Sequence, residues 1–160
     1  KDLIGVPWRL AFELQKRGWI LRSDIIWAKL NPMPESCTDR PTMSHEHIFL
    51  FAKNQRYYYD HESIMERTVG VEYPKRNKRD VWNVKVASYP EAHCATFPME
   101  LITPCIKAGS PEGGLVLDPF MGSGTVAQAA KQLSRKYTGC ELNPDYYKII
   151  NNRLKQQELF

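Results

Sequence analysis

Apolar and polar positions in the first third of the chain predict one helix followed by two strands. Residues 7–18, PWRLAFELQKRG, have amphipathic helical spacing, with a proline suited to the first turn and a glycine suited to the end. Residues 19–30 and 45–53 are rich in β-branched and aromatic side chains, which favours strands. The two prolines of NPMPES lack N–H donors, so residues 31–44 are expected to form a loop. QRYYYD, residues 55–60, predicts a turn into a further extended piece.

The rest of the chain begins irregularly and ends in a regular alternation. Residues 61–92 mix charges and prolines around one short strand candidate, VWNVK. Residues 98–109 predict a helix that Gly109 closes and that Pro104 kinks or restarts. The order strand, helix, strand, helix then follows over residues 115–120, 126–135, 136–142 and 144–157.

This alternation is typical of an α/β fold with a parallel sheet. Ligands of such folds bind beyond the carboxyl ends of the strands. Asp118 comes at one such end and Glu141 at the next, and a loop with Gly122 and Gly124 follows the first. Both carboxylates are therefore expected at the same edge of the sheet as the glycine loop.

Length and cysteine usage narrow the class of protein. A chain of 160 residues suits a single domain, and its longest apolar runs fall far short of the roughly 18 residues that a membrane span needs. The four cysteines form no CxxC pair, which favours reduced thiols in a cytoplasmic protein over disulfides or zinc. His45 and His47 lie on one face of a predicted strand without a third ligand, so we predict no metal site.

The net charge of +4 is modest but unevenly distributed. Lys75, Arg76, Lys78 and Arg79 lie in one polar stretch, PKRNKRD. Such a cluster can neutralise the phosphates of a nucleic acid. On charge alone, a solvated loop is the simpler interpretation.

The glycine loop allows three interpretations. A P-loop is excluded because the chain has no GxxxxGK[ST]. A dinucleotide fingerprint fits Gly122, Gly124 and Ala127, but a pyrophosphate would be repelled by the neighbouring Asp118. The third ligand is S-adenosylmethionine, whose ribose hydroxyls would be bound by Glu141 and whose ammonium would meet Asp118.

The position of the loop also separates these interpretations. After Glu141 the chain has room for only one more helix, whereas a dehydrogenase would need several further strands there. The rest of the sheet must therefore come from residues before 115. This order is that of a permuted fold, in which the cofactor half follows the other half.

These segments resemble a known family. LVLDPFMGSGTVAQAAKQLSRKYTGCELNPDYYKIINNRL is similar to the motif I and motif II region of the N6-adenine and N4-cytosine DNA methyltransferases, in their beta arrangement with a C-terminal cofactor half. HCATFPMELITPCIKAGSPEGG resembles the preceding element, and SDIIWAKLNPMPES and RPTMSHEHIFLFAKNQRYYYD resemble parts of the catalytic half. The resemblance covers nearly the whole chain and implies a permuted, Rossmann-like α/β fold of the S-adenosylmethionine-dependent methyltransferases.

The resemblance also implies roles for residues at matching positions. It makes 1–160 one methyltransferase domain, with part of a catalytic half (1–60), a DNA-contacting segment (61–92) and a cofactor-binding half (93–160). S-adenosylmethionine is expected at Asp118, Pro119, Phe120, Gly122, Ser123, Gly124, Thr125, Glu141 and Leu142, with Ala95, Thr96, Phe97 and Pro98 closing the other side. Double-stranded DNA is expected at Lys29 and Asn31, near a flipped base, and at Lys75, Arg76, Lys78 and Arg79.

One departure concerns the catalytic motif of the family, an acidic or polar residue followed by Pro-Pro and an aromatic residue. The chain has no Pro-Pro, and NPMP (31–34) and NPDYY (143–147) fall where the family has other elements. We therefore assign no catalytic residue. We expect this chain, which begins at Lys1, to lack an N-terminal part and to be inactive alone, with the missing segment or a second chain as a partner.

Two further points stay open at the level of sequence. PWRLAFELQKRGW with RSDIIWAKLNPMPES resembles the members that have a Ser-Pro-Pro motif, which favours N4-cytosine over N6-adenine as the target. A non-catalytic remnant that binds cofactor or DNA is the main alternative function. A dinucleotide-binding oxidoreductase fragment is the weaker alternative.

Overall fold

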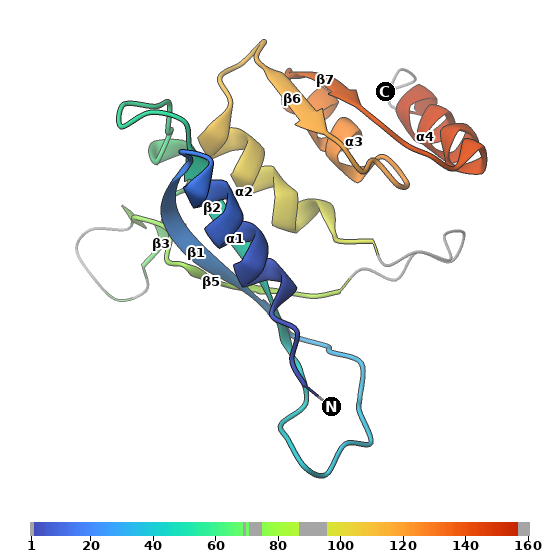
Figure 1. Cartoon of the computed structure of the whole chain (residues 1–160). Helices are drawn as coiled ribbons and strands as arrows, with labels where there is room; N and C mark the ends of the chain where they lie inside the picture. The colour runs from blue at the N-terminus through green and yellow to red at the C-terminus, as the bar shows by residue number, and fades with distance from the viewer. Residues whose placement is uncertain (1, 69, 71–74, 87–95, 157–160) are drawn as a thin grey trace. The chain divides into compact units, whose positions relative to one another are not determined.

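The computed structural model describes residues 2–68, 70, 75–86 and 96–156 (Figure 1). The chain divides into two compact units. Unit 1 comprises Lys1–Tyr57 and Arg79–Lys85, and unit 2 comprises Tyr58–Lys78 and Val86–Phe160. The predicted DNA-contacting segment 61–92 is therefore shared between the units, and the prediction of one domain stays a prediction.

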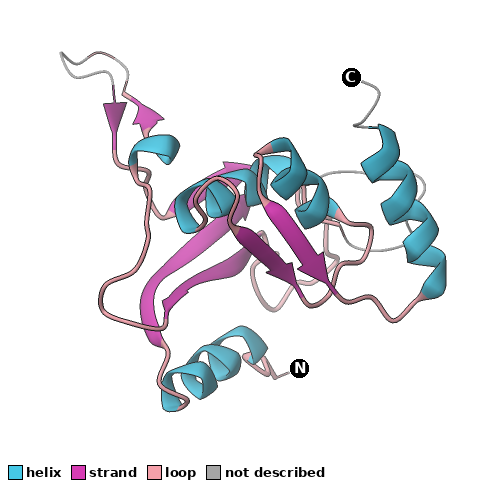
Figure 2. Cartoon of the chain, turned by 90° about the horizontal axis from the view of Figure 1, so that it is seen from above, coloured by secondary structure: helices cyan, strands magenta, loops and turns pink. Residues whose placement is uncertain are grey.

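Unit 1 is a helix and a mixed three-stranded sheet (Figure 2). Helix α1 and strands β1 and β2 appear where the sequence predicts them, and the VWNVK candidate becomes strand β5. The strand order is β2-β1-β5, with β2 antiparallel and β5 parallel to β1. The bounds of these elements are α1 Val6–Lys16, β1 Ile20–Lys29, β2 His45–Ala52 and β5 Val81–Val84.

Two tryptophans attach the short strand β5 to β1. Trp27 and Trp82 are opposite each other in the register of the parallel pair, and only 4% and 7% of their surfaces are exposed. The Trp27 Nε1–H donates to the Val84 carbonyl over 2.8 Å, and the Trp82 Nε1–H donates to the Arg79 carbonyl over 2.6 Å. Each indole thus buries its apolar ring while its one polar group is satisfied.

Helix α1 packs on the sheet through a small part of its surface. Ala11 is fully buried, and the Trp8 ring lies 5.1 Å from the rings of both His47 and Phe49 on β2. Gly18, at a φ of 87°, ends the helix in the left-handed conformation that glycine adopts most easily. The predicted helix and its stop are confirmed.

Unit 2 contains the predicted alternation of strands and helices. Its strands form two separate pairs, β3–β4 antiparallel and β6–β7 parallel. A single-turn 3₁₀ helix, η1, precedes the first pair. The bounds are η1 Glu62–Ile64, β3 Glu66–Arg67, β4 Lys75–Arg76, α2 Met99–Gly109, β6 Leu115–Asp118, α3 Thr125–Gln132, β7 Lys136–Gly139 and α4 Pro144–Gln156.

The structure bears on three sequence predictions in this part of the chain. After QRYYYD, residues 57–60 have no regular secondary structure, and η1 follows them. The kink given as one alternative at Pro104 stays a prediction, and helix α2 runs through this residue without restarting. Its last residue is Gly109 and its C-cap is Ser110, which is extended rather than left-handed, so Gly109 does not supply a glycine cap.

The core of unit 2 is built on both sides of helix α3. Ile106 of α2 packs with Val126, Ala129 and Ala130, and Ala127 packs with residues of α4. Ala129 and Ala130 have no exposed surface at all. Small side chains let α2 and α4 approach α3 closely, and this fixes the start of α3 behind the glycine loop.

Candidate functional site

Strands β6 and β7 bring the two predicted carboxylates to one edge. In the parallel pair, Asp118 lies opposite Gly139. The loops that follow are joined by backbone hydrogen bonds, from Cys140 N–H to the Asp118 carbonyl over 3.1 Å and from Met121 N–H to the Cys140 carbonyl over 2.9 Å. Asp118 and Glu141 therefore leave the sheet side by side, as the alternation of elements predicts.

The carboxylate of Glu141 is held by backbone amides from both loops. Its Oε2 accepts from Gly122 N–H over 2.7 Å, and its Oε1 accepts from Asn143 N–H over 2.8 Å. These amides, Asn143 first and then Gly122, together with Leu142, lower the pKa of Glu141 below its ordinary value of 4.5. An ionised carboxylate offers about four acceptor positions, so acceptor capacity remains for donors such as the hydroxyls of a sugar.

Asp118 shapes the beginning of the same loop. Its Oδ1 accepts from the N–H of Phe120 over 3.0 Å, a contact with the residue two positions on that favours a turn. Phe120 is left 88% exposed and Leu142 fully exposed. The site therefore combines two carboxylates with apolar surface on each loop, which suits a ligand with cationic and hydroxyl groups and a flat ring.

Glycines are required at three points of the site. Gly122 and Gly124 have positive φ angles of 51° and 80°, which side chains other than glycine adopt at a cost. At Gly139, a Cβ atom would lie 2.5 Å from the Asp118 carbonyl and also against the Met121 side chain. The sequence pattern indicates the first two glycines but not the third, whose role comes from the close approach of the two loops.

Arg153 of α4 supports the glycine turn from inside unit 2. Its Nη1 donates to the Ser123 carbonyl and to Ser123 Oγ, each over 2.9 Å, and to Thr125 Oγ1 over 3.3 Å. Ser123 and Thr125 are 3% and 6% exposed. These two predicted cofactor residues thus point their hydroxyls toward the arginine, and their part in the site is to fix the turn.

The structure also shows the approach to helix α2, predicted to close the other side of the cofactor. Pro98 is the N-cap of α2, and Thr96 and Phe97 precede it. Met99 packs against the core cluster shared by α2 and α3. Ala95 lies outside the described residues, so the prediction for it has no structural counterpart.

The predicted DNA contacts are divided between the units. In unit 1, Lys29 forms an ion pair with Glu46 at 2.5 Å and its ammonium lies 5.1 Å from the Trp27 ring centre. Asn31 is exposed just after β1. The charge of Lys29 is therefore already compensated within unit 1.

Of the basic stretch PKRNKRD, Arg79 belongs to unit 1, whereas Lys75, Arg76 and Lys78 belong to unit 2. Lys75 and Arg76 form strand β4, and the Arg76 Nε lies 2.7 Å from Glu66 Oε1 on β3. The stretch is therefore not the uniform loop that its composition suggests.

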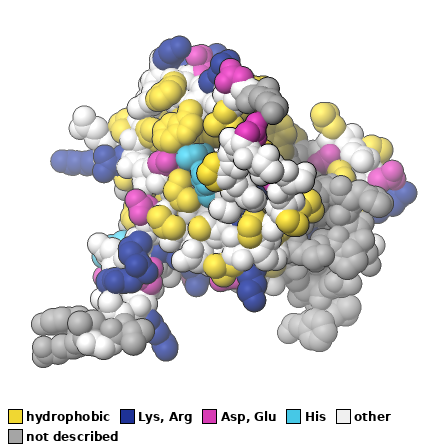
Figure 3. All heavy atoms as spheres, turned by 90° about the horizontal axis from the view of Figure 1, so that it is seen from below, with side chains coloured by type: hydrophobic (Ala, Val, Ile, Leu, Met, Phe, Trp, Pro, Cys, Tyr) yellow, Lys and Arg dark blue, Asp and Glu magenta, His cyan; other side chains and the backbone are white. Residues whose placement is uncertain are grey.

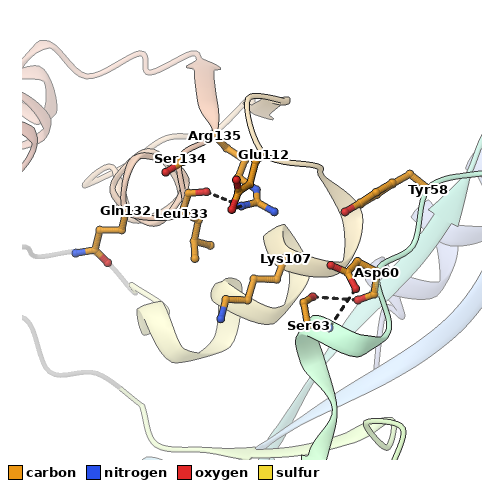
Figure 4. Close-up of a pocket in the computed structure, with 9 residues that line it drawn as sticks. All are labelled: Tyr58, Asp60, Ser63, Lys107, Glu112, Gln132, Leu133, Ser134 and Arg135. Atoms are coloured by element: carbon orange, nitrogen blue, oxygen red, sulfur yellow. Dashed lines mark hydrogen bonds and ion pairs between the residues drawn. The ribbon is translucent and has the colours of Figure 1, made fainter.

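Figure 4 shows the side chains that line a cavity of about 410 Å³ in unit 2, away from the glycine turn in sequence. It is lined by residues that precede the two strands and by the segment around η1. Its arginine, Arg135, donates to the backbone carbonyls of Ser110 and Leu133, which ties the start of β7 to the end of α2. We attribute a structural role to Arg135.

Cysteines and histidines take no part in the site chemistry that the described residues show. Cys37, Cys105 and Cys140 are free thiols, and burial raises the pKa of Cys105 to about 11. His47 Nδ1 lies 2.9 Å from Asp24 Oδ1. Within the described ranges, no group of three His, Cys, Asp or Glu side chains could hold a metal ion, and no helix has the length and apolar character to cross a membrane.

Comparisons with known proteins identify a family to which this chain is similar. Residues 4–152 match the N6_N4_Mtase family model, described as DNA methylase. The Type II methyltransferase M.Cfr9I of Citrobacter freundii is 54% identical over 158 residues, which cover 99% of this chain and 52% of that protein. The Type II methyltransferase M.SmaI of Serratia marcescens is 53% identical over 154 residues, which cover 96% of this chain and 53% of that protein. The chain thus spans about half the length of these relatives.

Solved structures share the fold. The M1.HpyAVI–SAM complex has a TM-score of 0.69 and 25% identity, over 96% of this chain and 71% of that chain. The PvuII DNA methyltransferase (cytosine-N4-specific) has a TM-score of 0.78 and 20% identity, over 96% of this chain and 60% of that chain. The sequence-based prediction of a Rossmann-like α/β methyltransferase fold is confirmed, and the chain belongs to the N6/N4 DNA methylase family.

Proposed function

We propose that this chain binds S-adenosylmethionine at the edge of β6 and β7 and serves in the methylation of an exocyclic amine of DNA. Membership of the DNA methylase family supports the reaction class. The observation that carries the proposal is Glu141, which amides of both loops hold ionised beside Asp118. The cofactor is supported by the structural similarity to M1.HpyAVI, which was solved as a complex with SAM.

The residues of the site fit the chemical groups of S-adenosylmethionine. Its ammonium and sulfonium are cations, which two neighbouring carboxylates attract and which a phosphate ligand would lack. Glu141 keeps acceptor capacity for the ribose hydroxyls, a bidentate use of an ionised carboxylate. The exposed Leu142 and Phe120 supply apolar surface for ring stacking. A dinucleotide would instead bring its pyrophosphate to Asp118, which disfavours the oxidoreductase alternative.

The bound cofactor would supply a methyl group on a sulfonium, which the nucleophilic amine of an extruded base accepts. The contribution of this chain is to orient the cofactor and to provide a fixed electrostatic environment. Lys29, Asn31 and the basic stretch would contact DNA. The resemblance to members with a Ser-Pro-Pro motif favours the N4 amine of cytosine, and analysis of the methylated nucleoside by mass spectrometry distinguishes this from N6-adenine.

Calorimetry tests the cofactor assignment. The purified chain should bind S-adenosylmethionine or its demethylated product and should bind NAD more weakly. Glu141→Ala should weaken binding about tenfold or more, since it removes hydrogen bonds to a charged acceptor. Asp145→Ala is the matched control, because Asp145 is an exposed acid on α4 whose carboxylate pairs with Lys148. Tighter binding of NAD, or equal effects of both substitutions, would contradict the assignment.

We also propose that the 160-residue chain transfers no methyl group by itself. The sequence has no Pro-Pro followed by an aromatic residue, and the chain spans only 52% of its relative M.Cfr9I. Methyl transfer requires the amine to be held in line with the sulfonium carbon at about 3–3.5 Å. Incubation with radiolabelled cofactor and unmethylated DNA should give no labelled DNA, and sustained turnover would refute the proposal and make Asn31 a catalytic candidate.

A further inference from the structure

The hairpin of β3 and β4 has two faces of different charge. The strands pair antiparallel, with Glu66 opposite Arg76 and Arg67 opposite Lys75 (Figure 2). Neighbouring residues of a strand point to opposite faces, and residues directly opposite each other share a face. One face therefore presents Glu66 with Arg76, and the other presents Arg67 with Lys75.

The first face is electrically neutral. The Arg76 Nε donates to Glu66 Oε1 over 2.7 Å, and the two side chains are 43% and 23% exposed. This cross-strand ion pair links the two strands of a hairpin that has only two paired residues in each. The ion pair helps to hold the two strands together, and Glu66 compensates the charge of Arg76.

The second face carries two cations whose charges no described residue compensates. Arg67 and Lys75 are both exposed, and neither side chain has a hydrogen bond or an ion pair with any described residue. Like charges directly opposite each other destabilise a hairpin. Figure 3, a space-filling view, shows dark blue Lys and Arg side chains exposed at the surface. An anion that lies against such a pair would relieve this repulsion.

We propose that Arg67 and Lys75 form a clamp for backbone phosphates of DNA, and that Arg76 holds the hairpin rather than the DNA. The proposal rests on the proposed function in DNA methylation. The clamp adds Arg67, which lies outside the basic stretch PKRNKRD, to the residues expected to contact DNA. It removes Arg76 from them. The clamp reads no sequence, because phosphate contacts position a protein on the duplex without identifying bases.

Charges on short edge strands also prevent pairing with other chains, and this is the competing explanation. The neutral face already places a charge on each strand, so protection against pairing does not require a second, mutually repelling pair. The phosphate clamp explains why both residues on the second face are cations. The two explanations predict different effects on DNA binding.

The test is the salt dependence of binding to a fluorescent DNA duplex, measured by anisotropy with the 160-residue chain. The variant Arg67→Ala with Lys75→Ala should lower the slope of log K against log salt by about 1.8, since each phosphate contact accounts for about 0.9. Glu66→Ala with Arg76→Ala leaves the net charge unchanged and removes only the support of the hairpin, so it should lower the slope less than the Arg67/Lys75 variant does. Lys16→Ala with Arg17→Ala removes two exposed cations from the end of α1 and should keep the slope unchanged.

Each result decides a different point. An unchanged slope in the Arg67/Lys75 variant, or an equal fall in the Lys16/Arg17 variant, would overturn the clamp while leaving DNA binding in place. Absence of salt-dependent binding by the unaltered chain would overturn the proposed DNA partner together with the clamp. The thermal midpoint of the Arg67/Lys75 variant should be unchanged or higher, because the substitution relieves repulsion, and this separates lost binding from lost folding.

Discussion

The glycine turn after β6 and the β3–β4 hairpin lie in the same unit but are stabilised in different ways. The turn is joined to the next loop by two backbone hydrogen bonds, bound by Glu141 and supported from inside by Arg153. The hairpin has two paired residues in each strand and one cross-strand ion pair with exposed partners. One segment is therefore fixed by backbone and buried groups, and the other by side-chain charge at the surface.

The difference matches the ligands proposed for the two segments. A small cofactor must be held in one orientation for transfer of its methyl group, and this requires a turn whose atoms do not move. A polyanion such as DNA is attracted over longer distances by charge, and its contacts tolerate a less rigid support. Substitutions in the turn should therefore affect folding and cofactor binding, whereas those in the hairpin should affect mainly the binding of DNA.

The largest expected effect comes from Arg153→Met, which removes the guanidinium that the turn requires. The Ser123 carbonyl and two nearly buried hydroxyls lose their donor. Hydrogen bonds from a charged group contribute about 1.5–3 kcal/mol, so we expect the free energy of unfolding to fall by about that amount. Chemical denaturation measures it, and Lys155→Met on the exposed side of the same helix is the control.

Affinity for S-adenosylmethionine should fall in the same Arg153→Met variant, while the salt slope of DNA binding should stay the same. A variant that kept full stability and full cofactor affinity would show that the turn does not depend on support from α4.

The next effect comes from Gly139→Ala, at the closest approach of the two loops. The new methyl group would lie 2.5 Å from the Asp118 carbonyl, and backbone cannot move aside as a flexible side chain can. Overpacking of this kind costs about 1–3 kcal/mol of unfolding free energy. We expect a lower thermal midpoint and weaker cofactor binding.

Gly109→Ala is a matched control for this substitution. A Cβ at Gly109 meets no atom within 4 Å, and the residue is helical with no positive φ. Alanine is favoured over glycine in helices, so this change should raise stability slightly. Equal destabilisation by the two substitutions would mean that the contact between the loops is not the cause.

The sequence predicted the cofactor half better than the segment before it, and the reason is physical. From residue 115 onward, the spacing of apolar residues and the positions of glycines predict the order of strands and helices. Parallel pairing of β6 and β7 then brings Asp118 and Glu141 to the same edge of the sheet. The support by Arg153 could not be predicted, because it joins residues about 30 positions apart through a side chain with no local signal. The hairpin was missed since two residues are too few to show a period.

The basic stretch PKRNKRD shows that sequence composition alone does not tell which charges are paired. Its composition correctly indicated clustered cations, but only the register of β3 and β4 separates the paired Arg76 from Lys75. Arg67 was overlooked because it is eight positions before Lys75 and becomes its neighbour only on pairing. Composition therefore finds a charged region, while strand register shows which charges are available to a ligand.

A smaller effect is expected on the pH dependence of the unfolding free energy, to which Glu141 contributes. Amides of Asn143 and Gly122 stabilise its ionised form, so its pKa in the folded chain lies below 4.5, the ordinary value. A lowered pKa contributes stability that is present above the ordinary value and is lost as the pH falls through the folded pKa. The difference in unfolding free energy between the unaltered chain and Glu141→Gln should therefore shrink on acidification. Carbon NMR of the Glu141 carboxyl measures its pKa directly, and a value above 4.5 would contradict the hydrogen-bonded arrangement.

The smallest effect should be found at the ion pair between Glu66 and Arg76. Both side chains are partly exposed, and pairs of this kind contribute about 0.2–1 kcal/mol, less at high salt. A double-mutant cycle with Glu66→Ala and Arg76→Ala should give a coupling energy in that range, measured by chemical denaturation. Affinity for S-adenosylmethionine should be unchanged in all three variants, because the glycine turn does not depend on the hairpin. A loss of cofactor affinity would show that the hairpin and the turn form one cooperative structure, and a coupling of several kcal/mol would show that the hairpin is not held by a weak surface pair. Either result would contradict the contrast between the two segments.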